Sequence, residues 1–384
     1  MLYSDYAYVI SELFTTNRPS DSWFFSESGL CFYFAPYEIA PHSAGTVVSE
    51  IPYDKLSGIL KDAYFPAEKD ISQGSLIHED FENADCVIKN PGVKFEGNKF
   101  LQAAKNIETD LSIFLRFTQC PIIAVTGSKG KSSTVSAIHY GLKQAGFNAF
   151  LGGNITVSPL TFFDEVSKET PVVLELSSWQ LADLRGRNVL KPFISIITKI
   201  VPDHQNWYGN MEDYVKDKRL IYADQVCTKE NSCYSIFDAE GDEVGQEPDK
   251  NLHSESSWGQ LFANESNACV LRYGKSKLND GVFGAWLEET KASKAYGKVF
   301  LPGMKEPVCI LNGLSVPGEH MTTNVLNAAL TLFLMGVEPA KIAEAMGKSR
   351  SAVANALRLL ELDPNETEQL KAGKISAGHA RCLL

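Results

Sequence analysis

Short apolar runs alternate with helical patterns through the middle of the chain. Residues 122–125 form a continuous run with a β-branched bias, which is typical of a strand buried on both faces. A helical pattern follows, with Val135, Ile138 and Leu142 on one stripe and Gly146 as its C-terminal stop. The alternation predicts an α/β fold with a parallel sheet over residues 121–336. Three further apolar runs predict strands, at residues 147–151, 172–176 and 193–200. The loops that follow all four strands are expected at the carboxyl edge of the sheet.

The first 66 residues have a different pattern, because they are rich in aromatic residues and tend to alternate. Residues 30–34 and 46–51 predict two strands, and residues 54–60 predict a short closing helix. We therefore expect a small β-rich segment over residues 1–66.

Residues 67–120 begin with a polar joint and then become more regular. Residues 84–88 predict a strand that ends in a turn. Residues 100–106 and 108–117 predict helices, and the second helix leads into the next strand.

Residues 337–384 predict two helices, at 339–346 and 349–362, with a turn between them. This is the spacing of a helix-turn-helix, although an ordinary surface helical hairpin is the alternative. From residue 341 onward seven Lys/Arg stand against five Asp/Glu, whereas the whole chain has a net charge of −11. Electrostatics therefore exclude the chain as a whole as a nucleic-acid binder.

The eight cysteines form no CxxC pair and no cluster with histidines, so we expect reduced cytoplasmic thiols and no zinc. The N-terminus lacks the basic start and apolar core of a signal peptide. The most apolar helical stretch, at 325–337, is too short to cross a bilayer. These observations predict a cytoplasmic protein without a membrane partner.

A glycine-rich loop separates the strand at 122–125 from the helix that follows it. The strand, the loop carrying Gly-Lys-Ser and the helix together form the arrangement of a phosphate-binding cradle. Lys131 would neutralise the β- and γ-phosphates of ATP, and the Ser132 hydroxyl would ligate Mg²⁺. The usual motif has a glycine where this chain has Val125, so the loop is a shortened variant. A glycine-rich turn without a nucleotide is the alternative. The candidate nucleotide-binding residues are Gly127, Ser128, Lys129, Gly130, Lys131, Ser132 and Ser133.

Four polar residues near other element ends are further candidates. Glu175 ends an apolar strand, where a carboxylate can hold Mg²⁺ but would be costly if unpaired. His204 follows another strand end and would ligate a second metal or support its ligands. Lys218 lies on a predicted helix at 214–223, and Asn324 lies on a helix where its amide would contact an adenine edge. Taken singly, His204 as a packed core histidine and Lys218 as a solvated helix charge are the alternatives.

Five spaced motifs strongly resemble the Mur ligases over residues 74–337. They are TGSKGKSS, GGNITVSPL, VVLELSSWQLADLRG, ITKIVPDHQNWYGNMEDYVKDKRLIYADQ and VPGEHMTTNVLNAAL. The resemblance is to the branch that adds D-glutamate to UDP-N-acetylmuramoyl-L-alanine in peptidoglycan synthesis. It implies an ADP-forming amide ligase with ATP and Mg²⁺, in which the substrate carboxylate becomes an acyl phosphate that the D-glutamate amine attacks.

The same resemblance implies roles for individual residues. Lys131, Glu175, His204 and Lys218 would be catalytic, and Lys218 occupies the position that family members carbamylate. Ser132, Glu175, His204 and Lys218 would hold the metals, Asn154 would lie near the substrate, and Asn324 would contact adenine. His320 matches the family histidine that opens its segment, whereas Met321 stands where asparagine is common.

The flanking regions resemble other families. Residues 1–66 contain a stretch similar to part of an extracytoplasmic domain of lysozyme-sensing anti-sigma factors, where the family has a Rossmann-like unit for the UDP group. Residues 337–384 strongly resemble the ParB helix-turn-helix, where the family has a third domain that supplies much of the D-glutamate site. Ser349, Arg350 and Ser351 would open its DNA-recognition helix, with Asn355 one turn further on.

We interpret the chain as a chimaera of these three families, with 67–120 as a remnant of the ligase N-terminal domain and linker, and 121–336 as its central ATP-binding domain. Mur ligase chemistry is the predicted function, and full ligation is expected to be impaired because two substrate-holding regions are replaced. A DNA-binding protein with a passive or ATP-sensing α/β domain is one alternative, and a non-functional chimaera is another.

Overall fold

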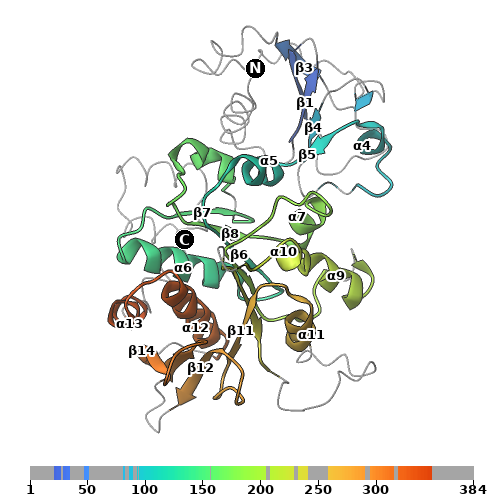
Figure 1. Cartoon of the computed structure of the whole chain (residues 1–384). Helices are drawn as coiled ribbons and strands as arrows, with labels where there is room; N and C mark the ends of the chain where they lie inside the picture. The colour runs from blue at the N-terminus through green and yellow to red at the C-terminus, as the bar shows by residue number, and fades with distance from the viewer. Residues whose placement is uncertain are drawn as a thin grey trace, which may run out of the picture. The chain divides into compact units, whose positions relative to one another are not determined.

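The computed structural model describes residues 81–82, 86–89, 93, 95–155, 157–204, 208–228, 232–240, 258–289, 295–314 and 319–347, together with the backbone of three strands within 21–51. The chain divides into two compact units (Figure 1). One consists of Met1–Gln119 and Ser158–Val166, and the other of Cys120–Val157 and Ser167–Leu384.

The first unit contains a five-stranded sheet with the order β3-β2-β1-β4-β5. β1 pairs antiparallel with both β2 and β4, β2 pairs antiparallel with β3, and β4 pairs parallel with β5. The strands expected near 30–34 and 46–51 are confirmed as β2 and β3, whereas the sequence did not predict β1, the middle strand. The bounds are β1 Asp21–Ser26, β2 Gly29–Phe34, β3 Val47–Ile51, β4 Cys86–Ile88 and β5 Ile107–Glu108.

Two capped helices lie in the described part of this unit. α4 (Lys99–Ala103) begins at Asn98, whose side chain accepts from two first-turn N–H groups, and α5 (Asp110–Phe117) begins with a capping box at Thr109. The helix expected at 100–106 is therefore too long, because Ala104 is already extended. The 3₁₀ segment η3 spans Pro159–Glu165. The short helix expected at 54–60 lies outside the described residues.

The second unit contains a nine-stranded sheet with the order β14-β13-β12-β11-β10-β9-β6-β8-β7. Seven neighbouring strands of this order pair in parallel, namely β12, β11, β10, β9, β6, β8 and β7. The strands β13 and β14 add an antiparallel edge. The expected parallel sheet is thus correct for its central part and wrong at that edge, where β12 and β13, and β13 and β14, pair antiparallel. The bounds are β6 Ile122–Thr126, β7 Phe150–Gly153, β8 Val172–Glu175, β9 Ile194–Ile197, β10 Tyr234–Asp238, β11 Cys269–Gly274, β12 Gly284–Glu289, β13 Ala295–Phe300 and β14 Val308–Leu314.

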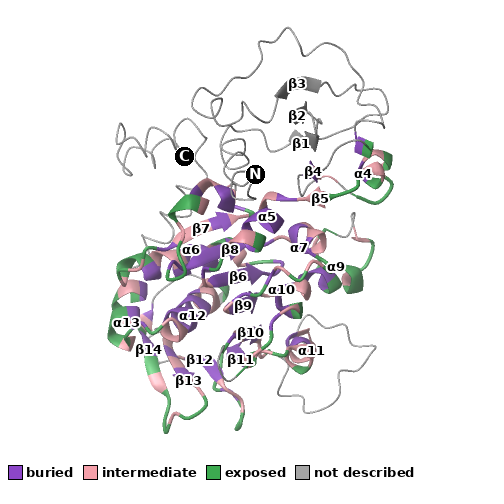
Figure 2. Cartoon of the chain, turned by 45° about the horizontal axis from the view of Figure 1, so that its top comes forward, coloured by how far each residue is buried: buried purple, intermediate pink, exposed green. Residues whose placement is uncertain are grey.

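Helices cover both faces of this sheet. α6 (Lys131–Gln144), α12 (Glu319–Leu334) and α13 (Pro339–Gly347) lie together on one side, and α7 (Ser178–Asp183), α9 (Met211–Lys218), α10 (Leu220–Ala223) and α11 (Trp258–Glu265) lie on the other (Figure 1). Every residue of β6, β8 and β9 is buried, and the purple colouring of Figure 2 follows these strands and the inner helix faces. Burial on both faces explains their continuous apolar sequences.

Two expectations for the helices need correction or completion. The helix expected at 214–223 is two helices, since α9 ends at Lys218 and α10 begins at Leu220. The helix expected at 339–346 is confirmed as α13. The second helix of the expected helix-turn-helix lies outside the described residues. Among the described helices, none is long and apolar enough to cross a membrane.

Candidate functional site

The loop between β6 and α6 passes very close to two other elements. A Cβ on Gly127 (φ 144°) would lie 1.9 Å from Thr198 Oγ1, and a Cβ on Gly130 (φ 90°) would lie 2.4 Å from Asn324 Oδ1. A side chain at either position would therefore clash with a neighbouring element, and the positive φ angle at each position also favours glycine. The loop is therefore held close to the end of β9 and to α12.

The end of β9 fixes the loop through hydrogen bonds. The N–H groups of Ser128 and Lys129 donate to Lys199 O at 2.9 and 3.3 Å, and Thr198 Oγ1 lies 2.7 Å from Lys129 O. Ser128 Oγ donates to Val201 O at 2.8 Å. Both the Thr198 side chain and the backbone carbonyls that follow β9 bind the loop. Its conformation is therefore set by this segment as much as by its own sequence.

The first turn of α6 provides an anion-binding end. Its N-cap, Gly130, makes no side-chain capping bond, so the first N–H groups of this 14-residue helix have no intrahelical or capping acceptor. Lys131 Nζ donates to Gly127 O at 3.0 Å and to Ser128 O at 3.2 Å. Burial lowers the pKa of Lys131 below its usual range. Ser132 is exposed on the same turn.

Lys218 reaches the same loop from α9. Only 1% of the residue is exposed, and its Nζ donates to Gly127 O at 2.8 Å while lying 4.5 Å from the centre of the Tyr214 ring. Burial, together with the positive charge of Lys131, lowers the pKa of Lys218 to about 7. The alternative that Lys218 is a solvated helix charge is therefore wrong.

Glu175 and Asn154 meet at the ends of β8 and β7. Asn154 N donates to Glu175 O at 2.8 Å, and Asn154 Nδ2 donates to Glu175 Oε1 at 3.1 Å. Glu175 is only 2% exposed, and its second oxygen, Oε2, has no hydrogen-bond partner. A buried carboxylate oxygen without a partner is costly unless a cation or donor binds it.

His204 lies beside aromatic residues at the surface. Its ring centre is 5.1 Å from that of Trp179 and 6.1 Å from that of Tyr214, and 46% of its side chain is exposed. Its Nε2 is 3.9 Å from the Asp203 carboxylate. The alternative of a packed core histidine is wrong. Across the described residues, no group of three or more His, Cys, Asp or Glu side chains converges as a metal site.

A cavity of about 770 Å³ adjoins the loop at the carboxyl ends of β10 and β11. Lys129 and Gly130 of the loop and His320 and Asn324 of α12 line it, together with residues from the two strand ends. The charged lining residues are Lys129, Lys199, Lys275, Lys277, Asp238 and Glu240. Four lysines and two acidic residues thus line a pocket that opens beside Gly130.

The structure brings Lys131, Lys218, Glu175 and Asn324 to the loop end of one sheet. The sequence analysis missed Thr198 and Tyr214, although a signal for Thr198 was present. Thr126 and Thr198 each follow a neighbouring apolar run with a hydroxyl, and Thr126 Oγ1 donates to Leu176 O at 2.7 Å. The recognition-helix residues Ser349, Arg350, Ser351 and Asn355 lie outside the described residues.

Three family models match separate stretches of the chain. The Mur ligase middle domain matches residues 125–332, the ParB HTH domain matches residues 331–384, and a protein of unknown function, DUF3298, matches residues 8–54. The three matches meet or stand apart with almost no overlap, as expected of a chimaera.

Curated relatives match the middle of the chain. UDP-N-acetylmuramoylalanine–D-glutamate ligase of Treponema pallidum (strain Nichols) is 43% identical over 272 residues, which is 67% of this chain and 49% of the relative. The enzyme of the same name from Borreliella burgdorferi (strain ZS7) is 55% identical over 147 residues, 38% of this chain and 32% of the relative. The chain thus spans at most about half the length of these relatives. Among solved structures, MurF from Acinetobacter baumannii aligns with a TM-score of 0.43 at 17% identity, over 64% of this chain and 52% of that one.

The burial of Lys218 makes stability depend on pH. Its pKa falls from 10.5 to about 7 on folding, so between these values the unfolded chain holds more protons than the folded chain. The free energy of unfolding is expected to rise between about pH 7 and pH 9, by up to roughly 1.4 kcal/mol per pH unit. Below about pH 7 the folded chain bears the full cost of a buried Lys218 ammonium. Above that pH the folded chain holds the neutral amine, and the cost is relieved.

Denaturant melts of Lys218→Met at several pH values test this expectation. The variant lacks the titrating amine, so its stability should rise less with pH than that of the wild-type chain. Lys216→Met, at an exposed position of the same helix, is the matched control and should keep the wild-type slope. An equal slope in the Lys218→Met and wild-type chains would contradict the prediction.

Proposed function

We propose that this chain, which belongs to the Mur ligase middle-domain family because that model matches more than half of it, is built to bind ATP for ADP-forming amide ligation. One observation carries the proposal. Lys131 Nζ and Lys218 Nζ both donate to Gly127 O, at 3.0 and 2.8 Å, from two different helices. Two lysine side chains thus converge on one loop atom beside the α6 N-terminus. Lys131 would bring positive charge to a transferring phosphoryl group, and Lys218, once carbamylated, would help to hold a cation there.

The proposed substrates are those named for the curated relatives. ATP would phosphorylate the carboxylate of UDP-N-acetylmuramoyl-L-alanine, and the D-glutamate amine would attack the resulting acyl phosphate through a tetrahedral intermediate. Lys131 would offset charge on the β- and γ-phosphates. Asn154, fixed by Glu175, would stand near the carboxylate substrate.

Magnesium fits part of the proposed site. Oε2 of Glu175 is a buried acceptor without a hydrogen-bond partner, and the Ser132 hydroxyl is exposed at the start of α6. These two oxygen ligands would hold Mg²⁺, which would supply charge neutralisation at the phosphates. His204 and a carbamylated Lys218 would hold a second ion. As an ammonium Lys218 cannot ligate a cation, but its lowered pKa leaves a share of neutral amine for carbamylation.

The cavity next to the loop is the proposed site for adenine and ribose. Asn324 lines it and lies against Gly130, so its amide would contact the base while the phosphates follow the loop toward Lys131. His320 lines the same cavity, and it is the histidine of the VPGEHMTTNVLNAAL motif. Met321 follows it without a polar group, so this chain makes less polar contact there than an asparagine would.

Binding of Mg·ATP is the direct test of the site. We expect affinity on the order of micromolar by titration calorimetry and a loss of at least about tenfold in Lys131→Ala, because a charge-assisted contact with phosphate is removed. Lys143→Ala, at an exposed position near the end of α6, should bind like the wild-type chain. Folded wild-type protein that binds no nucleotide would refute the proposal.

Full ligation is expected to be impaired. Formation and capture of an acyl phosphate require close positioning of three reactants, and the chain matches about half of its relatives. We expect ADP release that depends on D-glutamate to be far below ordinary ligase rates in a coupled assay, even where Mg·ATP binds. Steady turnover at ordinary ligase rates, abolished in Lys131→Ala, would overturn the expectation.

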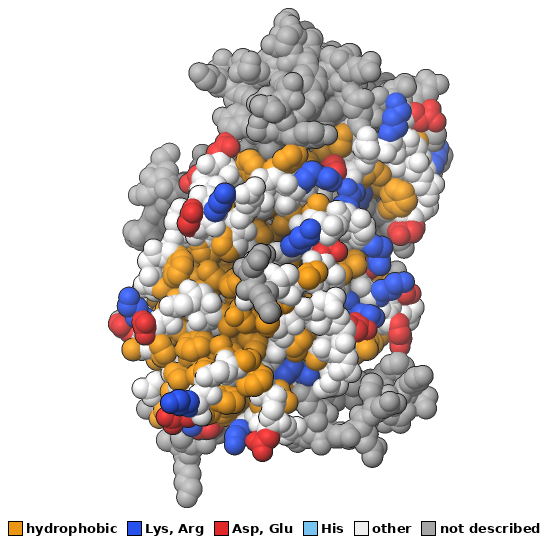
Figure 3. All heavy atoms as spheres, viewed as in Figure 1, with side chains coloured by type: hydrophobic (Ala, Val, Ile, Leu, Met, Phe, Trp, Pro, Cys, Tyr) orange, Lys and Arg blue, Asp and Glu red, His pale blue; other side chains and the backbone are white. Residues whose placement is uncertain are grey.

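DNA binding is a second proposed function, favoured by the match of residues 331–384 to the ParB HTH domain. On the face of the described residues drawn in Figure 3, basic and acidic side chains are interspersed. In this alternative the α/β unit is a passive or ATP-sensing body. Ser349, Arg350, Ser351 and Asn355 would contact the DNA.

Measurement of DNA affinity against salt concentration tests the alternative. Binding should weaken as salt rises, and Arg350→Ala should weaken it further, because a recognition-helix cation is lost. Lys216→Ala, on α9, should leave the affinity unchanged. Equal affinities of the Arg350→Ala and wild-type chains would contradict a role for this helix.

A further inference from the structure

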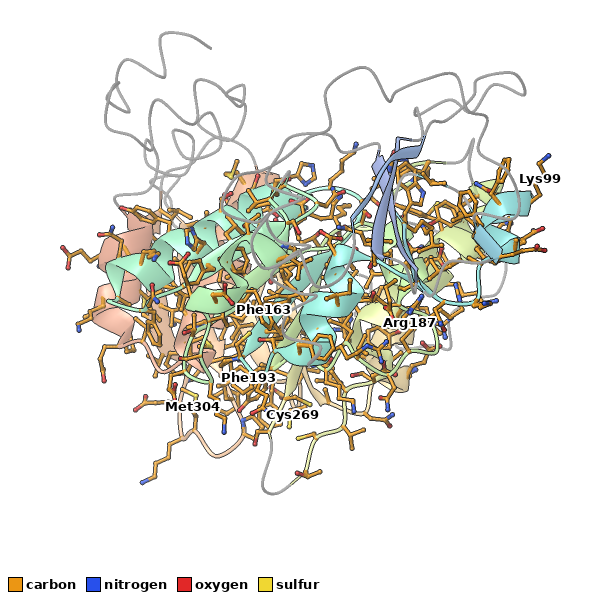
Figure 4. The ribbon with its side chains drawn as sticks, turned by 90° about the horizontal axis from the view of Figure 1, so that it is seen from above. Lys99, Phe163, Arg187, Phe193, Cys269 and Met304 are labelled. Atoms are coloured by element: carbon orange, nitrogen blue, oxygen red, sulfur yellow. The ribbon has the colours of Figure 1, made fainter. Side chains whose placement is uncertain are left out.

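Three cysteines from separate stretches of the chain meet at the amino-terminal edge of the nine-stranded sheet. Cys269, labelled in Figure 4, is the first residue of β11, and Cys233 directly precedes β10. Cys227 lies in the segment that follows α10. Cys269 N donates to Cys233 O at 2.9 Å, and Cys227 N donates to Asn267 O at 3.3 Å. The backbone of the sheet therefore fixes the cluster, on the edge opposite the phosphate loop.

Two of these thiols are placed for a covalent bond. The Sγ atoms of Cys227 and Cys269 are 3.0 Å apart, and both cysteines are free thiols. A disulfide needs a separation of about 2.05 Å, so closure requires a movement of about 1 Å. Cys269 is exposed and Cys227 is partly exposed, whereas Cys233 is buried. A small reagent thus reaches the first two sulfurs more easily than the third.

The two thiols differ in reactivity. A hydrogen bond from Cys269, together with the backbone N–H of Cys233, lowers the pKa of the Cys227 thiol. Desolvation of the Cys269 sulfur, with its hydrogen bond to Cys227, raises the pKa of Cys269 to about 11. Because the thiolate is the nucleophile, Cys227 is the first to attack and Cys269 the second.

We propose that Cys227 and Cys269 form a reversible disulfide by exchange with a low-molecular-weight disulfide. The Cys227 thiolate attacks one sulfur of the small disulfide, which gives a mixed disulfide and releases one small thiolate. Cys269 then loses its proton to solvent, and its sulfur attacks Cys227 Sγ and releases the second small thiolate. Two protein thiols are oxidised, and one small disulfide is reduced to two thiols.

The cross-link has a physical consequence that does not depend on nucleotide binding. It closes the stretch of chain from Cys227 to Cys269, which contains β10 and α11. Closing this loop restricts the unfolded chain more than the folded chain, in which the two sulfurs already touch. The oxidised chain should therefore melt at a higher temperature than the reduced chain.

Oxidised glutathione added to the full chain, followed by alkylation and peptide mapping by mass spectrometry, tests the proposal. Two of the eight thiols should become protected. The map should contain a Cys227–Cys269 cross-linked peptide that dithiothreitol removes, and the melting temperature should rise with oxidation. Eight alkylated thiols, a Cys227–Cys233 pair or a disulfide between two chains would each overturn the proposal.

Variants separate the two steps. Cys269→Ser should stop at a mixed disulfide on Cys227, whereas Cys227→Ser should form no cross-link at Cys269. Cys309→Ser is the matched control, because Cys309 is also exposed but its Sγ donates to Leu311 O on β14. This variant should form the cross-link as the wild-type chain does. The wild-type peptide map decides the proposal even where a variant fails to fold.

Discussion

The contact between the β6–α6 loop and the end of β9 is the constraint on which the site depends. Thr198 occupies the space that any Cβ on Gly127 would need, and its hydroxyl lies 2.7 Å from Lys129 O. This contact fixes the start of α6, and hence the first-turn N–H groups and Lys131. It also exposes Gly127 O to Lys218 from α9. A loop that moved away from β9 would lose the helix end and both lysines together.

The site places ionisable side chains in a buried environment, where their charged forms cost folding free energy. Burial lowers the pKa values of Lys131 and Lys218, and the buried Glu175 keeps one oxygen without a hydrogen-bond partner. In an isolated fold this arrangement costs stability, because each charged form loses its solvation. A polyanion with a divalent cation would offset both costs, since it offers oxygens to the lysines and a positive ion to the carboxylate. The same groups that weaken the fold therefore favour a bound nucleotide.

Local sequence patterns predicted the buried central strands and the glycine loop of the second unit. The apolar runs of β6, β8 and β9 and the glycine loop were visible, and strand ends in a parallel sheet converge, so Glu175 and Lys131 were placed correctly. The antiparallel β13–β14 edge was missed because short alternating runs do not show the direction of pairing. The thiol pair of Cys227 and Cys269 was missed because 41 residues separate them in sequence. The pairing of β10 with β11 and the backbone bond from Cys227 N to Asn267 O bring them together in the fold.

The candidate site residues lie within one of the two units. Lys131, Lys218, Glu175 and Asn324 all belong to the unit made of Cys120–Val157 and Ser167–Leu384, which has its own sheet and its own apolar core. The unit before it has a different sheet, in which β1 pairs with β4 and so joins the N-terminal strands to the next region of the chain. The hydrogen bonds that support the loop, Lys218 and Glu175 come from the same unit as these site residues.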